Sequence, residues 1–226
     1  MLKKEWGPVF AIAILMAFRM LGLFMILPVF SVQASQFQGH TPTLVGLTLG
    51  IYGLTQALLQ IPFGLTSDYL GRKPVITFGL ILFALGSILA ANAHSIYGLL
   101  WGRAIQGSGA IGSTCLALLT DVSRDENRTK AMAVVGMMIG LSFALAVIIG
   151  PIVNTYFQLS GIFWLTAILA TIALVLLYTM IPNPPAISHK HKQTLLQRYQ
   201  AVFHNTQLIR LNFGIFSQHA IMTSLF

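Results

Sequence analysis

Two arginines stand inside stretches of the chain that are otherwise apolar. Arg19 lies within one such run, and Arg103 lies within another, three residues before Gln106. A charged side chain inside hydrocarbon costs roughly 3 kcal/mol or more unless it faces water or a polar partner. Arginine keeps its proton, so it would act by binding a partner or by tuning a nearby acid. We therefore expect both arginines to face a polar cavity.

Neutral polar side chains in the apolar runs are expected to line that cavity with the arginines. The whole set comprises Arg19, Tyr52, Gln56, Gln60, Arg103 and Gln106. A proton-carrying group is harder to find, because no Asp or Glu lies between Pro8 and Ser67 or in the middle of another apolar run. The candidates are Asp68, Asp121 and His219. Of these residue types, only histidine titrates near physiological pH without a perturbing environment.

A short polar segment separates the second apolar run from the third and carries charges of both signs. It reads GLTSDYLGRK from Gly64 to Lys73. Gly71 permits a backbone conformation that other residues resist, and Gly64 allows another helix to approach closely. Asp68 and Arg72 are placed to meet helix ends or one another. An ordinary turn rich in basic residues is the alternative interpretation.

The composition requires that most of the chain is surrounded by lipid. Of the 226 residues, 56% are hydrophobic and only 8% are charged, whereas soluble domains average about 25% charged residues. The net charge of +8 is spread over short segments between apolar runs, which is typical of membrane orientation and not of nucleic-acid binding. The single cysteine, Cys115, excludes an intrachain disulfide. We expect no metal site and no cofactor.

Six apolar runs are long enough to cross a bilayer as helices, which takes about 20 residues each. They do not alternate polar and apolar residues as the strands of a membrane barrel do. We predict an all-α membrane protein with six transmembrane helices, at residues 8–33, 43–66, 74–93, 97–120, 131–153 and 161–181. A seventh helix begins near residue 211 and reaches residue 226 before it could span the membrane.

The segments between these helices differ sharply in charge. Eleven of the 13 lysines and arginines lie in one set, which comprises residues 1–5, 67–74, 121–130 and 183–210. The other set carries no charged residue and comprises residues 34–42, 94–97 and 154–160. Short basic loops stay in the cytoplasm. We therefore place the amino terminus and the segment after the sixth helix on the cytoplasmic side of a plasma membrane.

The chain divides into a six-helix bundle at 1–182, a linker at 183–210 and the incomplete seventh helix at 211–226. Prolines at the start of the linker stop the sixth helix, and a basic cluster follows at 189–192. Apolar residues recur at helical spacing between 195 and 203. They indicate an amphipathic helix on the cytoplasmic membrane face, although a solvated connector fits equally well.

The bundle shows traces of a duplicated unit of three helices. Arg19 and Arg103 lie 84 residues apart, and Gly53 and Gly136 lie 83 apart. A near-constant offset is what a three-plus-three repeat leaves behind, and transporter folds are often built in this way. We therefore expect two pseudo-repeats of three helices each.

The segment from Gly64 to Lys73 resembles the signature loop of the major facilitator superfamily, in which Gly, three residues, Asp and two residues precede Gly-Arg-Lys. Its place between the second and third helices also matches, although Tyr69 stands where the family carries a basic residue. The run from Arg103 to Ala110 is similar to the family's Arg-x-x-Gln-Gly-x-Gly-Ala pattern in helix four. The resemblance implies the amino-terminal half of such a transporter.

Two further likenesses narrow the branch of the family. Helix five resembles in part the motif of the drug/proton antiporters, at Gly140, Gly150 and Pro151. Residues 19–133 are similar to the YajR-like branch of bacterial drug exporters. The resemblance implies a latch in which Asp68, Arg72 and Asp121 form a charge cluster that stabilises the outward-open state. The full set assigned to this latch is Gly64, Asp68, Gly71, Arg72, Lys73 and Asp121.

The resemblance also implies the activity, which is proton-coupled efflux of small amphipathic molecules across a bacterial inner membrane by alternating access. The expected partners are the lipid bilayer, a small-molecule substrate, protons and a carboxy-terminal half that is missing from this chain, with no nucleic acid among them. Two buried arginines argue against a purely cationic substrate, because like charges repel in a low dielectric.

Two other classes of function compete with transport as interpretations of the sequence. A truncated product that acts at most as an oligomer partner is the alternative, since the chain stops within a helix and the fold normally needs a matching half. A membrane enzyme is not expected, because the sequence places no paired carboxylates, metal ligands or nucleophile–base pair at membrane depth.

Overall fold

The computed structural model describes residues 3–33 and 36–182, together with positions 206, 207, 209–211, 213, 214 and 217. The chain forms two compact units, Met1–Ile187 and Ser188–Phe226. In the second unit the described positions are helical. The predicted basic cluster at 189–192, the amphipathic helix at 195–203 and His219 lie outside the described residues.

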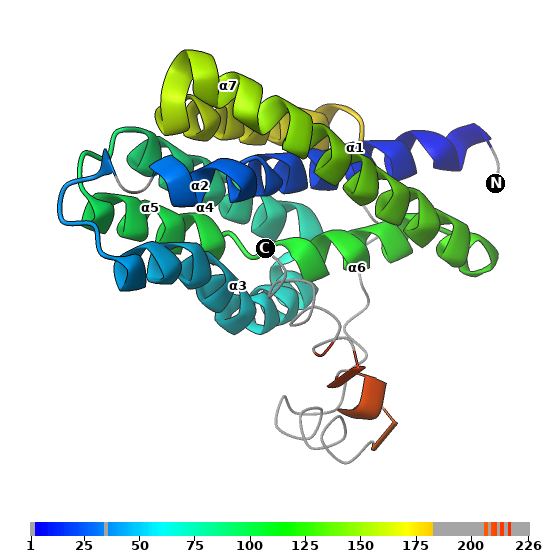
Figure 1. Ribbon diagram of the computed structural model, residues 1–226. Coiled ribbons are helices and arrows are strands. Elements are labelled where there is room, and N and C mark those ends of the chain that lie inside the picture. The colour runs from blue at the N-terminus through cyan, green and yellow to red at the C-terminus, as the bar shows by residue number, and fades with distance from the viewer. Residues whose placement is uncertain are drawn as a thin grey trace. The chain divides into compact units, whose positions relative to one another are not determined.

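The described part of the first unit is helical almost throughout, which confirms the predicted all-α class (Figure 1). The elements are α1 (Lys3–Phe24), α2 (Leu27–Gln33), α3 (Pro42–Leu70), α4 (Arg72–Ala91), α5 (Ile96–Ser108), α6 (Gly112–Val122), the 3-10 turn η2 (Asp125–Asn127) and α7 (Arg128–Thr179). Among the described residues, Gln38 and Ser95 form an isolated bridge. Helix α1 packs chiefly on α7, α4 packs on α5 and α7, and α3 packs on α5.

Four helical stretches in the described residues are each long and apolar enough to cross a membrane: Trp6–Phe30, Pro42–Leu70, Arg72–Ala91 and Asp125–Thr179. The last spans 55 residues, which is about 80 Å and far exceeds the ~30 Å hydrocarbon core. It reverses direction at Gln158, where φ is 57° and ψ is −168°, and Figure 1 shows α7 folded back on itself. Helix α7 therefore supplies both the fifth and the sixth predicted helices.

The connection predicted at 154–160 is shorter in the structure than the sequence suggested. Helix α7 continues past Pro151 and Asn154 before it reverses at Gln158. Pro151 lies inside the helix instead of ending it, because hydrocarbon offers no water to the backbone of a broken helix. The prediction that residues 154–160 form a loop is therefore wrong for most of that segment.

The first and fourth predicted helices are each interrupted, which was not predicted. Helix α1 ends at Phe24, four residues before Pro28. A proline has no N–H and its ring clashes with the carbonyl four residues earlier, so this end follows from the sequence. Helix α5 ends at Ser108, where Gly109 is pressed against α4. A Cβ added at Gly109 would lie 2.3 Å from a backbone oxygen of α4.

The two interruptions follow the predicted repeat. Phe24 and Ser108, the last residues of α1 and α5, lie 84 residues apart, which is also the offset between Arg19 and Arg103. Each arginine therefore occupies the same position relative to a helix end, five residues before it. The break gives the pseudo-repeat a structural counterpart beyond the matched residue pairs.

Backbone contacts at glycines set the position of α5 between its neighbours. A Cβ at Gly86 of α4 would lie 2.3 Å from the backbone nitrogen of Gln106, and one at Gly107 of α5 would lie 2.3 Å from the backbone oxygen of Tyr52 on α3. Only glycine permits helices to approach this closely. These contacts fix the depth and rotation at which α5 presents Arg103 and Gln106.

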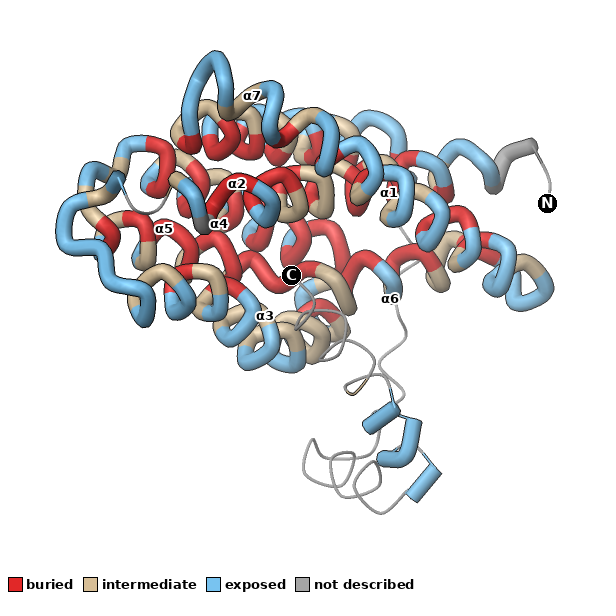
Figure 2. The backbone as a smooth tube through the Cα atoms, viewed as in Figure 1, coloured by how far each residue is buried: buried red, intermediate tan, exposed pale blue. Residues whose placement is uncertain are grey.

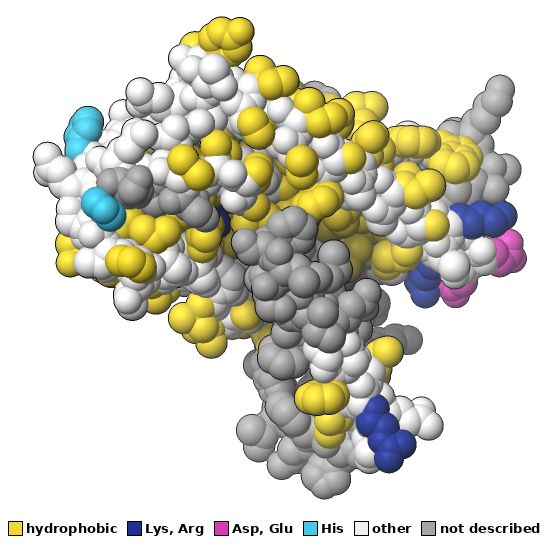
Figure 3. Space-filling view, in the orientation of Figure 1, with side chains coloured by type: hydrophobic (Ala, Val, Ile, Leu, Met, Phe, Trp, Pro, Cys, Tyr) yellow, Lys and Arg dark blue, Asp and Glu magenta, His cyan; other side chains and the backbone are white. Residues whose placement is uncertain are grey.

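The surface divides into an apolar body and a charged end. Buried residues run along the inner faces of the helices and exposed residues along the outer faces (Figure 2). Large apolar side chains such as Leu58, Phe78, Trp101 and Ile148 are exposed, which suits a helix bundle in lipid. Figure 3 shows acidic and basic side chains gathered near the end of the first unit where α6 meets α7, and histidines at the opposite end.

Candidate functional site

Five of the six residues predicted to line a cavity meet where α1, α3, α4 and α5 come together. With one serine they form what we term the buried cluster: Arg19, Tyr52, Gln56, Ser87, Arg103 and Gln106. The cluster draws side chains from helices that are far apart in sequence. Its members are joined by hydrogen bonds and by one contact between a cation and an aromatic ring.

Tyr52 lies between the two arginines. Arg19 donates from Nη2 to the hydroxyl of Tyr52 at 3.3 Å and to Oε1 of Gln56 at 3.0 Å. The guanidinium of Arg103 lies over the ring of Tyr52, 4.5 Å from its centroid, where the negative face of the ring attracts a cation. Arg19 also lies 5.7 Å from the ring centroid of Phe83. One tyrosine therefore contacts a cation from each pseudo-repeat.

A chain of hydrogen bonds through neutral side chains ties Arg103 to α4. Arg103 donates from Nη1 to Oε1 of Gln106 at 2.5 Å, and Gln106 donates from Nε2 to the hydroxyl of Ser87 at 2.8 Å. Ser87 in turn donates to the backbone oxygen of Phe83 at 2.7 Å. Gln106 and Ser87 are fully buried. The relay holds the amide of Gln106 in one orientation, with its oxygen toward the cation.

Both arginines retain donors that no partner satisfies. Arg19 is 2% exposed and Arg103 is 1% exposed. The buried Nε and Nη1 of Arg19 and Nε of Arg103 have no hydrogen-bond partner. The side chains that accept from these arginines, Tyr52, Gln56 and Gln106, are neutral. The site therefore combines two positive charges with spare N–H groups.

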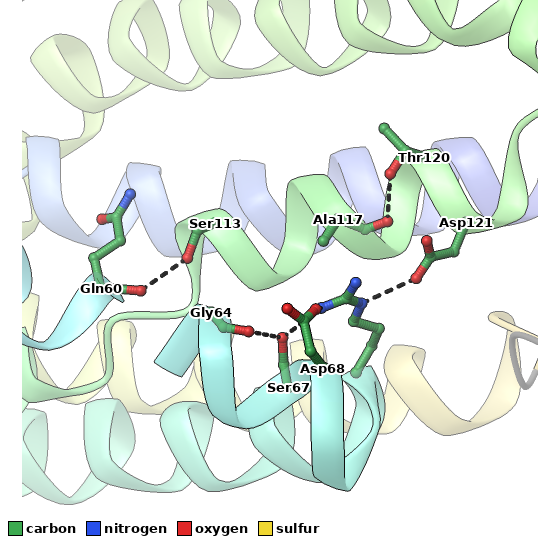
Figure 4. A network of polar contacts seen from close by, with 9 residues as sticks. Gln60, Gly64, Ser67, Asp68, Ser113, Ala117, Thr120 and Asp121 are labelled. Carbon is green, nitrogen blue, oxygen red and sulfur yellow. Dashed lines mark hydrogen bonds and ion pairs between the residues drawn. The ribbon is translucent and has the colours of Figure 1, made fainter. Parts of the chain in front are cut away.

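Gln60, the sixth residue of the predicted set, lies at the edge of the buried cluster. Its backbone oxygen accepts from the hydroxyl of Ser113 at 3.1 Å, which joins α3 to α6 (Figure 4). A Cβ added at Gly112 would lie 3.8 Å from the amide of Gln60 and 3.9 Å from Nη1 of Arg19. The amide of Gln60 and Nη1 of Arg19 therefore both lie near Gly112.

A second polar group, the loop cluster, lies at the charged end and comprises Ser67, Asp68, Arg72 and Asp121. Arg72 donates from Nη1 to Asp68 at 2.5 Å and to the hydroxyl of Ser67 at 2.6 Å, and from Nε to Asp121 at 2.9 Å. In Figure 4 the labelled side chains of the cluster converge on this one guanidinium. The bonds tie together α3, α4 and α6. The role of a latch stays a prediction.

Lys73, assigned to the latch with its neighbours, does not join the loop cluster. Its Nζ donates to the backbone oxygen of Ile181 at 2.6 Å and lies 5.6 Å from the ring centroid of Tyr178. The hydroxyl of Tyr178 forms a hydrogen bond with Thr77 at 2.8 Å. A cation just beyond the carboxyl end of a helix is favourable. Lys73 therefore fastens the end of α7 to α4.

The two glycines assigned to the latch have different roles. Gly71 joins α3 to α4 with φ of 91°, a conformation that favours glycine. At Gly64 an added Cβ would lie 3.4 Å from the hydroxyl of Ser113, which is an ordinary contact distance. Alanine would fit there, so the close helix approach expected at Gly64 is not required by the structure.

The three residues of the helix-five motif do not form one site. Gly140 is exposed with open space beside it, whereas a Cβ at Gly150 would lie 2.6 Å from the backbone oxygen of Met25, at the break between α1 and α2. Pro151 is exposed. Gly150 thus permits α7 to pack on the end of α1. A role of this motif in antiport stays a prediction.

Two serines in these clusters were missed by the sequence analysis. Serines in membrane helices usually bond to a carbonyl three or four residues earlier, so sequence does not distinguish Ser87 from an ordinary helical serine. Ser67 carried a clearer signal, because it stands beside Asp68 in the charged loop. Among the described residues, no group of three His, Cys, Asp or Glu side chains could hold a metal ion.

Comparisons with known proteins agree with this architecture. A sequence profile of the Major Facilitator Superfamily matches residues 12–226. The inner membrane transport protein YajR of Escherichia coli K12 is 44% identical over 225 residues, covering 99% of this chain and 49% of that protein. A class H tetracycline resistance protein of Pasteurella multocida is 31% identical over 137 residues, covering 59% of this chain and 33% of that protein.

The chain spans about half the length of YajR, and a solved structure shows the same proportion. The bacterial homologue of the human lysosomal transporter Spinster, in an inward-facing and unoccupied conformation, matches with a TM-score of 0.72 at 15% identity. The match covers 89% of this chain and 49% of that one. At this identity the likeness concerns the fold alone. Since the profile covers nearly the whole sequence, the chain belongs to the major facilitator superfamily.

Proposed function

We propose that this chain supplies six helices of a secondary transporter that exports small amphipathic molecules in exchange for protons. The buried cluster is the observation that carries the proposal. Ionisable groups deep in membrane helices usually line a substrate or ion pathway, because their cost is otherwise uncompensated. The names of two relatives, an inner membrane transport protein and a tetracycline resistance protein, favour export across a bacterial inner membrane.

The substrate pathway would run along the helices that carry the buried cluster. In alternating access, two halves of the transporter rock around a central site. The cavity would be lined by α1, α3, α5 with α6, and the first part of α7. The amino terminus would lie in the cytoplasm, together with the loop cluster and the basic segment 121–130.

The loop cluster would act as the latch of this cycle. Arg72 bridges carboxylates on two different elements, α3 and α6. Because these groups lie at the charged end of the unit and not at its centre, water can replace their bonds when the elements separate. An ion pair in such a place is strong enough to favour one state and weak enough to open.

A second half would cover the outer faces of α3 and α7. Gly46, Gly50 and Gly53 on α3 and Gly136 and Gly140 on α7 have no atom near the place of an added Cβ. Small residues in membrane helices mark faces where another helix packs closely. Gly53 on α3 and Gly136 on α7 occupy equivalent positions in the two pseudo-repeats. We propose that both faces receive helices of the carboxy-terminal half.

The proton carrier would lie outside the buried cluster or in that second half. All five acidic residues of the chain lie outside the middle of the apolar runs. Asp68, Asp121 and His219 are the candidates within the chain, and Arg103 would tune a carboxylate brought close by the partner half. Arginine itself keeps its proton throughout the cycle.

Transport in proteoliposomes tests this proposal. The complete transporter containing this chain is reconstituted, and vesicles with an acidic interior are given tetracycline or ethidium. We expect at least one of the two probes to accumulate as protons leave, and a protonophore to abolish the accumulation. Accumulation of the probes that does not depend on the proton gradient, or no accumulation at all, would contradict the proposal.

Vesicles that contain only this chain test the alternative of a non-transporting fragment. We expect no accumulation there, and recovery when the second half is supplied. If the chain assembles with the second half but the probes still do not accumulate, the chain is better interpreted as a non-transporting fragment than as part of a transporter.

A further inference from the structure

The charges of the buried cluster are not balanced by any acid of the chain at that depth. The chain has five acidic residues, which are Glu5, Asp68, Asp121, Asp125 and Glu126. In the described part of the chain, ion pairs join Arg72 to Asp68 and Asp121, and one joins Arg128 to Asp125. All of them lie at the charged end of the first unit. Arg19 and Arg103 thus keep their full positive charges.

The unpartnered nitrogens show which chemistry the buried cluster lacks. Nε and Nη1 of Arg19 and Nε of Arg103 are buried donors without an acceptor. A buried donor left unsatisfied costs about 1–3 kcal/mol, and more when it is charged. A group that only accepts hydrogen bonds and carries negative charge would remove both costs. Carboxylate, sulfonate and phosphate have this chemistry, and the planar fork of arginine matches their oxygens.

The packing beside Arg19 leaves room for one further carbon atom at Gly112. Gly112 has no side chain, and a Cβ added there would contact Nη1 of Arg19 and the amide of Gln60 only at ordinary distances, 3.8–3.9 Å. The amide of Gln60 offers a further donor on the same side. Nearby, the rings of Tyr52 and Phe83 contact the two guanidinium groups and are themselves buried.

We propose that Arg19 and Arg103 form a subsite for the oxyanion head of an amphipathic substrate. The aromatic or aliphatic body of that substrate packs on Tyr52 and Phe83. This inference rests on the proposed transport function and narrows its substrate class to organic acids. A cationic amphiphile is disfavoured at this subsite, because two positive charges face it in a medium of low dielectric.

Binding of two matched probes tests the subsite. Naphthalene-2-sulfonate and 2-naphthyltrimethylammonium share an aromatic body and differ in the sign of the head. Titration calorimetry on the complete transporter containing this chain, in lipid nanodiscs, should give a Kd at least tenfold lower for the sulfonate. Arg19→Gln and Arg103→Gln should each raise that Kd tenfold or more, and the corresponding lysine variants should raise it less.

Two further variants guard against a folding artefact. Gly112→Val keeps both charges and fills the space beside Arg19, so we expect weaker sulfonate binding at unchanged helix content. Lys130→Gln removes an exposed cation outside the subsite and should leave the Kd unchanged. Equal binding of the two probes, or arginine-to-glutamine variants that remain helical and bind like the wild type, would overturn the proposal.

The transport assay separates a failure of this inference from a failure of the proposed function. Proton-driven accumulation of ethidium, with no binding of the sulfonate, would refute the oxyanion subsite and leave the exporter intact. Selective sulfonate binding without transport of any probe would refute the exporter and leave the subsite as a binding site.

Discussion

The chain holds arginines in two contrasting settings. In the loop cluster, Arg72 faces two carboxylates whose side chains are 38% and 24% exposed. In the buried cluster, Arg19 and Arg103 are nearly inaccessible and their side-chain acceptors are neutral. A charge pair at 4 Å gains about 4 kcal/mol at an effective dielectric of 20. At the charged end, carboxylates of the chain neutralise the charge of Arg72. In the interior, no acidic side chain of the described residues pairs with Arg19 or Arg103.

The two clusters also differ in what positions them. Ion pairs hold the loop cluster, because they join α3, α4 and α6 directly. Backbone contacts at glycines hold the buried cluster, because Gly86 and Gly107 fix α5 against its neighbours. Loss of one charge should therefore loosen the first cluster, whereas the second should respond most to added volume between its helices.

The largest effect is expected from Gly86→Ala. Its new Cβ would lie 2.3 Å from the backbone nitrogen of Gln106, so α4 and α5 must separate. We expect the free energy of unfolding to fall by about 3 kcal/mol, measured by titration with dodecyl sulfate in mixed micelles. Gly7→Ala is the matched control, because open space surrounds Gly7. Equal losses in the two variants would show that glycine contacts do not position the buried cluster.

Next in size is Arg72→Gln, which removes the cation that Asp68 and Asp121 share. Since the pair is partly exposed, we expect a loss of about 2 kcal/mol, below the 3–5 kcal/mol typical of a fully buried pair. Arg128→Gln provides the control, because its pair with Asp125 is exposed and should contribute about 0.5 kcal/mol or less. The same micelle titration measures both. Similar losses in the two variants would show that the ion pairs of the loop cluster stabilise the fold no more than an exposed ion pair does.

A smaller effect is expected from Tyr52→Phe. The substitution removes the hydroxyl that accepts from Arg19 and keeps the ring that faces Arg103. We expect a loss of about 1 kcal/mol, the value of one hydrogen bond, from thermal unfolding followed by circular dichroism. Tyr97→Phe, at an exposed tyrosine, should change nothing. If the stability of the Tyr52→Phe variant were unchanged, Arg19 would have a better hydrogen-bond acceptor than this hydroxyl.

The smallest change in stability is expected from Arg103→Gln, and this gives the sharpest test of the comparison. Removing an uncompensated buried charge relieves its desolvation cost, so the free energy of unfolding should change by less than about 1 kcal/mol or rise. The same substitution at Arg72 should be clearly destabilising. The two are compared side by side in mixed micelles. A loss at Arg103 equal to that at Arg72 would reveal a neutralising partner.

Several features of the fold were predictable because lipid imposes them. The hydrocarbon core demands long apolar helices, so the six predicted segments are helical in the structure. Pro28 also signalled the end of α1 in the sequence, although we predicted one continuous helix across it. The reversal at Gln158 falls inside the connection predicted at 154–160, but no glycine or charged residue marks Gln158 itself as the turning point.

The sequence alone determined which residues lie at which depth, since each helical residue advances the chain by about 1.5 Å. It therefore placed Arg19 deep in an apolar helix, Arg103 nearer the end of another, and Asp68 and Arg72 at a helix end. Only the tertiary structure decided that both arginines meet at Tyr52 and that Lys73 turns away from its neighbours toward Ile181. Such meetings depend on helix rotation and spacing, which backbone contacts between distant segments set and local spacing does not.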